Sequence, residues 1–85
     1  MNPIKIKLSR PLDINGASVT ELTMREPKVK DMRLARTGTR DEADQEVRLF
    51  ANLCEITPDN IDDLPVRDYG QLQEAFTTFT SPAGK

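Results

Sequence analysis

The stretch IKIKLSRPLDINGASVTELTM, residues 4–24, decides how the fold begins. Its first five residues alternate strictly, which places Ile4, Ile6 and Leu8 on one face of a strand and two lysines on the other face. Pro11 cannot donate a hydrogen bond to a neighbouring strand, so it indicates an edge strand or a bend. The sequence therefore predicts a half-buried first strand that is interrupted once.

Asn15-Gly16 marks the turn that follows this strand. Both residue types tolerate the positive φ angles that a type I′ turn requires, so the pair is typical of a hairpin. We expect the return strand over residues 17–24, with Leu22 and Met24 facing inward. The chain is thus predicted to begin with two antiparallel strands joined by a tight turn.

A short helix is predicted over residues 28–36. It lies between Pro27, which ends the extended run, and Gly38, which suits a left-handed helix end. The apolar residues of this segment are Val29, Met32, Leu34 and Ala35.

The strongest helical signal lies in residues 40–55, where apolar side chains recur at helical spacing. Thr39 and Glu42 have the spacing of a capping box, which predicts that this helix starts beside them. The apolar stripe consists of Ala43, Val47, Phe50, Ala51 and Cys54. Because Cys54 continues the stripe and the chain has no histidine to activate it, we interpret it as a packed thiol.

Two further helical segments are expected toward the carboxyl end. Thr57-Pro58 combines a good cap with a proline that is tolerated at the first helical position, so residues 58–63 are predicted to form a single turn. A last helix over residues 66–79 aligns its apolar side chains along one face, namely Val66, Tyr69, Leu72, Ala75, Phe76 and Phe79. Because strands precede helices, the predicted fold is α+β: a small antiparallel hairpin or sheet with three to four short helices packed on it.

The 85 residues amount to one small domain, which we expect to span residues 1–79. Residues 80–85 lack apolar periodicity and contain Ser-Pro-Ala-Gly, so they are predicted to form a flexible C-terminal tail. No stretch approaches the roughly 20 apolar residues that a membrane span needs, and we therefore expect a soluble, cytoplasmic protein.

The composition argues against an enzyme. Histidine and tryptophan are absent and there is a single cysteine, so the residue types that most often carry acid–base catalysis, zinc binding and nucleophilic attack are almost missing. With 36% hydrophobic and 31% charged residues, the chain has material for one modest core and little for an enclosed pocket. The sequence predicts no catalytic residue and no cofactor.

Asp59, Asp62 and Asp63 are the candidate ligands for a metal ion. A calcium-binding loop needs oxygen ligands at alternating positions and a glycine at the sixth, whereas this segment places Ile61 and Leu64 among the carboxylates. We interpret the three aspartates as a solvated helix start and predict no metal site.

The charges are unevenly distributed along the chain. Residues 25–40 carry six basic and two acidic groups, whereas residues 41–68 carry nine acidic and two basic groups. Lys30, Arg33 and Arg36 are able to share an outward face of the predicted short helix. Such asymmetry can steer a charged partner or support head-to-tail self-contact.

Nucleic-acid binding is an alternative interpretation of residues 25–40. Proteins that read single strands add aromatic stacking platforms to their basic groups, and no aromatic residue lies in this stretch. The isoelectric point near 5.0 is also far from the basic profile of a dedicated nucleic-acid-binding protein. We therefore disfavour nucleic-acid binding as the function of residues 25–40.

One set of residues is distinctive through its order and spacing along the chain, although no single member is specific. The set consists of Leu8, Pro11, Gly16, Val19, Leu22, Met24-Arg25-Glu26-Pro27, Asp31, Ala51, Leu53, Thr57-Pro58, Ile61, Leu64 and Asp68-Tyr69. Its most specific pieces are Leu-Thr-Met-Arg-Glu-Pro at 22–27 and Leu-Pro-Val-Arg-Asp-Tyr at 64–69. Over about residues 4–79 the chain resembles the small tail assembly chaperones of contractile-tailed phages and prophages, P2-like or Mu-like, of the E, 41 or 14 type. Glu55 departs from similar sequences, which often have a glycine at the end of the middle helix.

The resemblance implies a non-enzymatic protein of the host bacterial cytoplasm that holds the long, helical tape measure protein and keeps it soluble until tail tube subunits polymerise around it. It implies release afterwards, so that the protein is absent from the virion, and it implies no cofactor. Family members are often also made in a longer form by a translational frameshift, for which residues 80–85 are the expected junction. The longer form, the tail tube protein and a homo-oligomer are further candidate partners.

For the tape measure protein, we expect the contact surface to combine the last helix with the basic short helix. The candidate partner-binding residues are Lys30, Arg33, Arg36, Phe76 and Phe79. Among the aromatic residues, Tyr69 and Phe76 are expected in the core, and Phe79 near the chain end is expected to contact a partner. Two other functions stay open: a small phage nucleic-acid-binding or regulatory protein that uses residues 25–40, and a structural subunit that stays in the particle.

Overall fold

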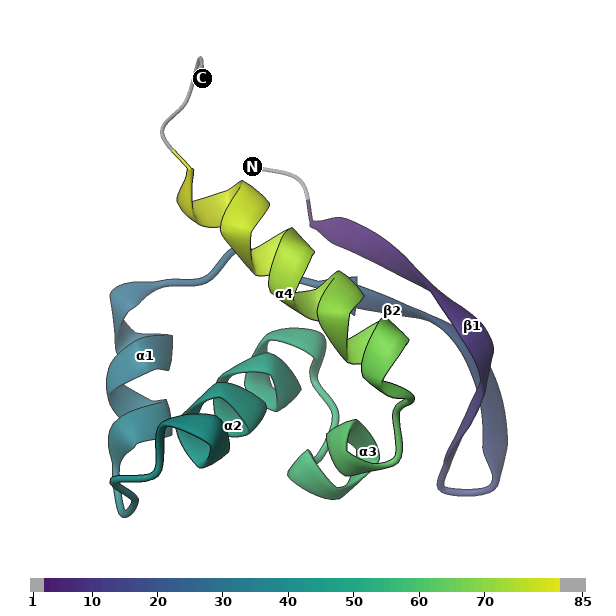
Figure 1. The fold of residues 1–85 in the computed structure, drawn as a ribbon, viewed down its shortest axis with the longest axis horizontal. Helices are drawn as coiled ribbons and strands as arrows, with labels where there is room; N and C mark the ends of the chain where they lie inside the picture. The colour runs from purple at the N-terminus through teal and green to yellow at the C-terminus, as the bar shows by residue number, and fades with distance from the viewer. Residues whose placement is uncertain (1–2, 82–85) are drawn as a thin grey trace.

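The structure is a computed structural model that describes residues 3–81. Strands β1 (Ile4–Ile14) and β2 (Ala17–Met24) form an antiparallel hairpin, and four helices follow it (Figure 1). The helices are α1 (Val29–Arg36), α2 (Glu42–Cys54), α3 (Pro58–Asp62) and α4 (Val66–Thr80). The α+β fold predicted from the sequence, a hairpin followed by helices packed on it, is confirmed.

The helices differ in how they meet the hairpin. Helix α4 packs on β1 and α2 packs on β2, while α3 contacts both α2 and β1. Helix α1 packs mainly on α2, and it lies on the side of the molecule farthest from the hairpin turn (Figure 1). The hairpin, α2 and α4 therefore form the centre of the fold, and α1 is attached at its periphery.

The hairpin turn forms as its sequence predicts. Asn15 and Gly16 have φ angles of 54° and 84°, the positive values that a type I′ turn requires. The backbone N–H of Gly16 also donates a hydrogen bond to Oδ1 of Asp13 at 2.8 Å. In the register that follows, Ile14 pairs with Ala17 and Ile4 pairs with Met24.

Strand β1 is irregular between Lys7 and Leu12, the region that contains Pro11. This interruption agrees with the bend predicted at the proline. It also leaves the backbone N–H of Ser9 free to donate to Asp68, 59 residues further along the chain, at 3.0 Å. The irregularity thus connects the hairpin to the start of α4.

The start of the middle helix differs from the prediction. Helix α2 begins at Glu42, and its cap is Asp41, whose carboxylate accepts hydrogen bonds from the N–H groups of Ala43 at 2.9 Å and Asp44 at 3.4 Å. The capping box expected of Thr39 and Glu42 is wrong because Asp41 stands closer to the open N–H groups. The hydroxyl of Thr39 instead accepts from the N–H of Asp41 at 3.2 Å.

The other helix boundaries agree more closely. Thr57 caps α3 as predicted, and Thr57 and Asn60 form a reciprocal capping box. Helix α4 extends to Thr80, so the first residue of the expected tail is helical. Residues 82–85, the rest of that tail, lie outside the described residues.

The core gathers the inward residues of the hairpin, α2 and α4. The most deeply buried apolar side chains are Met24, Phe50, Leu53 and Leu72, none more than 1% exposed. Leu22 is buried as predicted. Ala43 and Val66 are exposed, contrary to the predicted stripes, because each stands in the first turn of its helix, before the part that packs on the core.

Cys54 is buried in this core, and burial raises the pKa of its thiol to about 12. The interpretation of Cys54 as a packed thiol is therefore confirmed.

Candidate partner-binding surface

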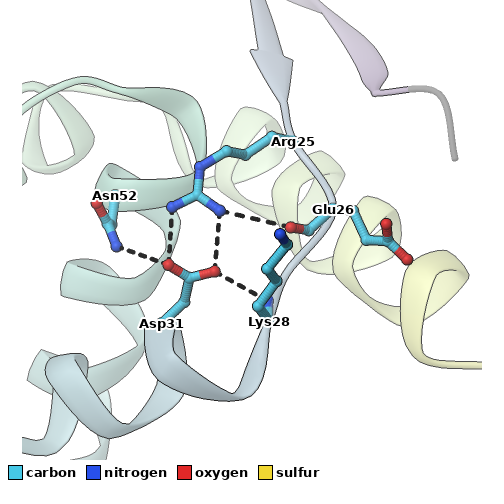
Figure 2. Close-up of polar contacts among 5 residues, drawn as sticks. All are labelled: Arg25, Glu26, Lys28, Asp31 and Asn52. Atoms are coloured by element: carbon cyan, nitrogen blue, oxygen red, sulfur yellow. Dashed lines mark hydrogen bonds and ion pairs between the residues drawn. The ribbon is translucent and has the colours of Figure 1, made fainter.

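Helix α1 is held in place by a buried carboxylate, Asp31, which is 3% exposed. The guanidinium of Arg25 donates to both of its oxygens, at 2.7 Å and 2.9 Å (Figure 2). The backbone N–H of Lys28 donates to Oδ2 at 2.9 Å, and the side-chain amide of Asn52 donates to Oδ1 at 3.1 Å. These four residues, the Asp31 cluster, join the end of β2, the start of α1 and the face of α2.

The chain around the Asp31 cluster is shaped to make these contacts. Pro27 favours an extended residue on its amino side and cannot continue a strand, so the chain turns there into α1. The backbone N–H of Arg25 donates to the carbonyl of Leu53 at 3.1 Å, which ties the end of β2 to the end of α2. The hydrogen bond from Arg25 lowers the pKa of Asp31 to about 2, so the ion pair persists at neutral pH.

Because the charge of Asp31 is balanced within the cluster, the exposed charges of α1 are positive. Lys30, Arg33 and Arg36 are all exposed, as the sequence predicts. The apolar residues of the helix are exposed as well: Val29 is 74%, Leu34 63% and Met32 39% exposed. Only Ala35 of the apolar residues in α1 is buried. Helix α1 therefore presents a mixed basic and apolar surface.

One side of α1 borders a small hollow of about 170 Å³ between α1, α2 and α4. Its apolar lining comes from Met32 and Ala35 of α1, Leu49 and Phe50 of α2, and Phe76 of α4, and its polar lining includes Arg36 and Glu46. We call this feature the Phe76 hollow. Its size suits a single apolar side chain, with one cation, Arg36, and two carboxylates, Glu42 and Glu46, in its lining.

Aromatic packing fixes the floor of the Phe76 hollow. The ring of Phe50 lies 5.8 Å from that of Phe76 and 5.5 Å from that of Tyr69, measured between centroids. Tyr69 donates its hydroxyl hydrogen bond to Glu46, and Gln73 donates to the same carboxylate at 3.2 Å. Burial and this contact raise the pKa of Tyr69. Phe76 and Tyr69 are half-buried against the core, as predicted.

The structure brings together two of the five candidate residues, Arg36 and Phe76, which line the same hollow. Lys30 and Arg33 are exposed on α1 but do not line it, and Phe79 is half-buried against the core near the end of α4. The sequence interpretation missed Met32 and Glu46. An exposed methionine within a basic helix was the available signal for Met32, whereas Glu46 is identified only by its contacts with α4.

A second buried carboxylate anchors α4. Asp68 is fully buried and accepts hydrogen bonds from the hydroxyl of Ser9 at 2.9 Å and the amide of Gln71 at 3.0 Å, besides the Ser9 N–H. Burial raises the pKa of Asp68, but these hydrogen bonds outweigh that effect and leave it below its ordinary value. Asp31 and Asp68 are thus the centres of two structural clusters.

Neither cluster provides a site for chemistry on a substrate, since each carboxylate is already saturated by protein donors. Within residues 3–81, no group of three or more cysteine, aspartate or glutamate side chains is arranged to hold a metal ion, Asp59, Asp62 and Asp63 included. Over the same residues, no helix is long and apolar enough to cross a membrane. The arrangement is suited to recognition through charge and apolar contact.

The motifs quoted from the sequence carry these structural contacts: Arg25 and Asp31 make the first cluster, and Asp68 makes the second. No curated protein and no solved structure matches the chain significantly. Residues 5–81 match the model of one protein family, which is described as "Phage tail assembly chaperone proteins, E, or 41 or 14". The chain belongs to this family of non-enzymatic tail assembly chaperones.

Proposed function

We propose that the chain binds the tape measure protein of its phage in the host cytoplasm, keeps it soluble while the tail tube polymerises, and is not retained in the virion. Membership of the tail assembly chaperone family supports an assembly role. The observation that supports direct binding is α1, which exposes Val29, Met32 and Leu34 among its basic side chains. Val29 and Met32 are three residues apart and share one side of α1, whereas Leu34 lies on the other side. Exposed apolar side chains rimmed by charge are typical of a protein–protein contact.

The Phe76 hollow is the centre of the proposed contact. An apolar side chain of a partner helix enters between Met32 and Phe76, and carboxylates of the same helix pair with Arg36 at its edge. Lys30 and Arg33 on α1 and Phe79 on α4 extend the contact to either side. We expect a contact centred on one small hollow to be reversible, which suits a chaperone that leaves when the tube forms.

The mechanism requires no cofactor and no chemical step. The chaperone covers apolar faces of the tape measure protein that would otherwise associate with one another, and it competes with tail tube subunits for the same segments. A longer frameshifted form of the chain, with residues 80–85 at the junction, would contact the tail tube protein and bring the two partners together.

Co-expression tests this function. The tape measure protein is produced in bacteria with and without the chain, and its soluble fraction is measured. In a second step, capture of the tape measure protein on the tagged chain is measured before and after nuclease treatment. We expect the chain to raise the soluble fraction and to capture the tape measure protein regardless of nuclease. Arg33→Glu with Arg36→Glu, and separately Phe79→Ala, are expected to reduce capture.

Lys5→Glu on the exposed face of the hairpin is the matched control, because it reverses an exposed charge that lies on β1 and does not line the Phe76 hollow. Equal capture by the wild type and the α1 variants would show that the surface is wrong. Capture of nucleic acid alone, lost in high salt, would favour the regulatory alternative. Recovery of the chain from purified virions would favour the structural subunit.

A further inference from the structure

The other side of α1 borders a second, larger groove of about 420 Å³, which runs between α1 and the start of α3. Leu34 forms its α1 wall, Ala51 lies on its floor in α2, and Ile56 and Pro58 form the opposite wall. Leu34 is 63% exposed. We call this feature the Leu34 groove, and its lining is mainly apolar.

Beyond the lining of the Leu34 groove, the two helices that flank it expose opposite charges, which we call the basic wall on α1 and the acidic wall on α3. Lys30 lies one helical turn before Leu34 and therefore shares its side of α1, with Arg33 beside it. On the other wall, α3 and the corner that follows it expose Asp59, Asp62 and Asp63. Arg48 near the floor is already engaged, because it donates to the carbonyl of Thr37 at 2.9 Å and pairs with Asp44 at 3.0 Å.

A surface with a basic wall beside an acidic wall is complementary to itself after a rotation of 180°. The rotation sets the basic wall of each copy against the acidic wall of the other and brings the two Leu34 side chains toward the axis. We propose that a second copy of this chain covers the Leu34 groove, forming a twofold dimer in which α1 of each copy faces α3 of the other.

Because both partners in this dimer are copies of the same chain, the exposed charges on each side of the contact are those of α1 and α3. The acidic wall disfavours nucleic acid as the occupant, because it would repel phosphate groups. The dimer uses the side of α1 that carries Leu34 and leaves the Phe76 hollow, on the side of Met32 and Arg36, open. The dimer shares Lys30, Arg33 and Leu34 with the proposed tape measure contact, but it is tested on the chain alone, so its failure is distinguishable from a failure of the proposed function.

Sedimentation equilibrium of the full chain alone tests the dimer, over a range of concentrations and at low and high salt. We expect a reversible monomer–dimer equilibrium that weakens as salt rises, because opposite charges meet across the contact. Leu34→Ser should shift the equilibrium to monomer by about tenfold or more in the dissociation constant. Val29→Ser is the matched control: it also removes an exposed apolar side chain from α1, but outside the groove, and should leave the dimer intact.

Charge variants test whether the basic wall of one copy faces the acidic wall of the other. Lys30→Glu with Arg33→Glu, and Asp62→Lys with Asp63→Lys, should each weaken the dimer by about tenfold or more, since like charges then face each other. Combining all four substitutions restores opposite charges and should restore dimerisation. Circular dichroism of each variant verifies that it is folded.

Three results would overturn the proposal. The first is a chain that stays monomeric up to about 1 mM at low salt. The second is a dimer that is unaffected by Leu34→Ser and by the charge reversals. The third is a monomer in which Leu34→Ser weakens capture of the tape measure protein, because the groove would then belong to that partner. The first two results leave the proposed binding at the Phe76 hollow untouched, whereas the third would place part of the tape measure contact in the Leu34 groove.

Discussion

Helices α1 and α4 are attached to the same core in different ways. Helix α4 buries Leu72 and Ala75, at 0% and 5% exposure, and its Asp68 is saturated by neutral donors from β1 and from α4 itself. Helix α1 buries Ala35 and the carboxylate of Asp31, and it leaves Leu34 in solvent. The difference indicates that apolar burial in α4 holds the fold together, whereas α1 is positioned by an ion pair and leaves its larger apolar side chains exposed.

The same substitution in the two helices gives the largest expected contrast. Leu72→Ala removes a fully buried side chain and should lower the free energy of unfolding by about 3 kcal/mol. Leu34→Ala removes an exposed one and should change it by less than about 0.5 kcal/mol. Urea unfolding followed by circular dichroism, at a concentration where the chain is monomeric, measures both. Comparable losses for the two variants would mean that α1 contributes to the core.

Removing the charge of Asp31 should come next in size. Asp31→Asn loses the ion pair with Arg25 and leaves an amide facing the donors of Lys28 and Asn52, so we expect a loss of about 2 kcal/mol. Asp62→Asn, on an exposed carboxylate, is the control and should have little effect. If the two variants unfold at the same urea concentration, the Asp31 cluster does not hold α1.

Acidification should weaken the same cluster without a mutation. The folded pKa of Asp31 is about 2, below its ordinary value of 3.8, so the stabilisation is complete above about pH 4 and is lost as pH falls through 2. Because Arg25 is 36% exposed and partly screened by solvent, we expect a loss of about 1 to 2 kcal/mol. Urea unfolding between pH 6 and pH 2 measures it. Asp31→Asn should show a flatter profile, and an unchanged slope would contradict the assignment.

The ends of α1 and α2 offer the smallest contrast. Gly38 follows α1 with a φ of 83°, a conformation that glycine adopts freely, whereas Glu55 ends α2 with a φ of 59°. Glu55→Gly should therefore raise the free energy of unfolding by about 1 kcal/mol. Glu55→Ala, which removes the same charge but keeps a side chain, should not. Equal stability of the two variants would show that left-handed strain is not the cause.

Local patterns in the sequence were sufficient for the hairpin and for the existence of all four helices. Alternating residues and Asn15-Gly16 fix the strands, and apolar spacing fixes α2 and α4. The roles of Asp31 and Asp68 could not be predicted, because their hydrogen-bond partners come from other elements. Ser9, a partner of Asp68, lies 59 residues away in the sequence. For the same reason Val29 and Leu34 were indistinguishable from core residues until the structure placed Ala35 and Asp31 on the buried side of α1.

The candidate surface was predicted in part. The basic residues of α1 are exposed as expected, since long charged side chains seldom bury without partners. Arg36 and Phe76 line the same hollow, whereas Lys30 and Phe79 do not, and this depends on how α1 and α4 are placed on α2. Tertiary packing of this kind leaves no periodic trace in the sequence.

Site-specific photo-crosslinking during tail assembly tests the central claim, that α1 beside the Phe76 hollow binds the tape measure protein. A photoreactive residue replaces either Met32, which lines the hollow, or Thr20, which is exposed on β2. Irradiation of cells that are assembling tails, followed by mass spectrometry, identifies the captured protein. We expect the tape measure protein to be crosslinked at position 32 and not at position 20. Crosslinking at both positions alike, or at neither while the chain still keeps the tape measure protein soluble, would contradict the account.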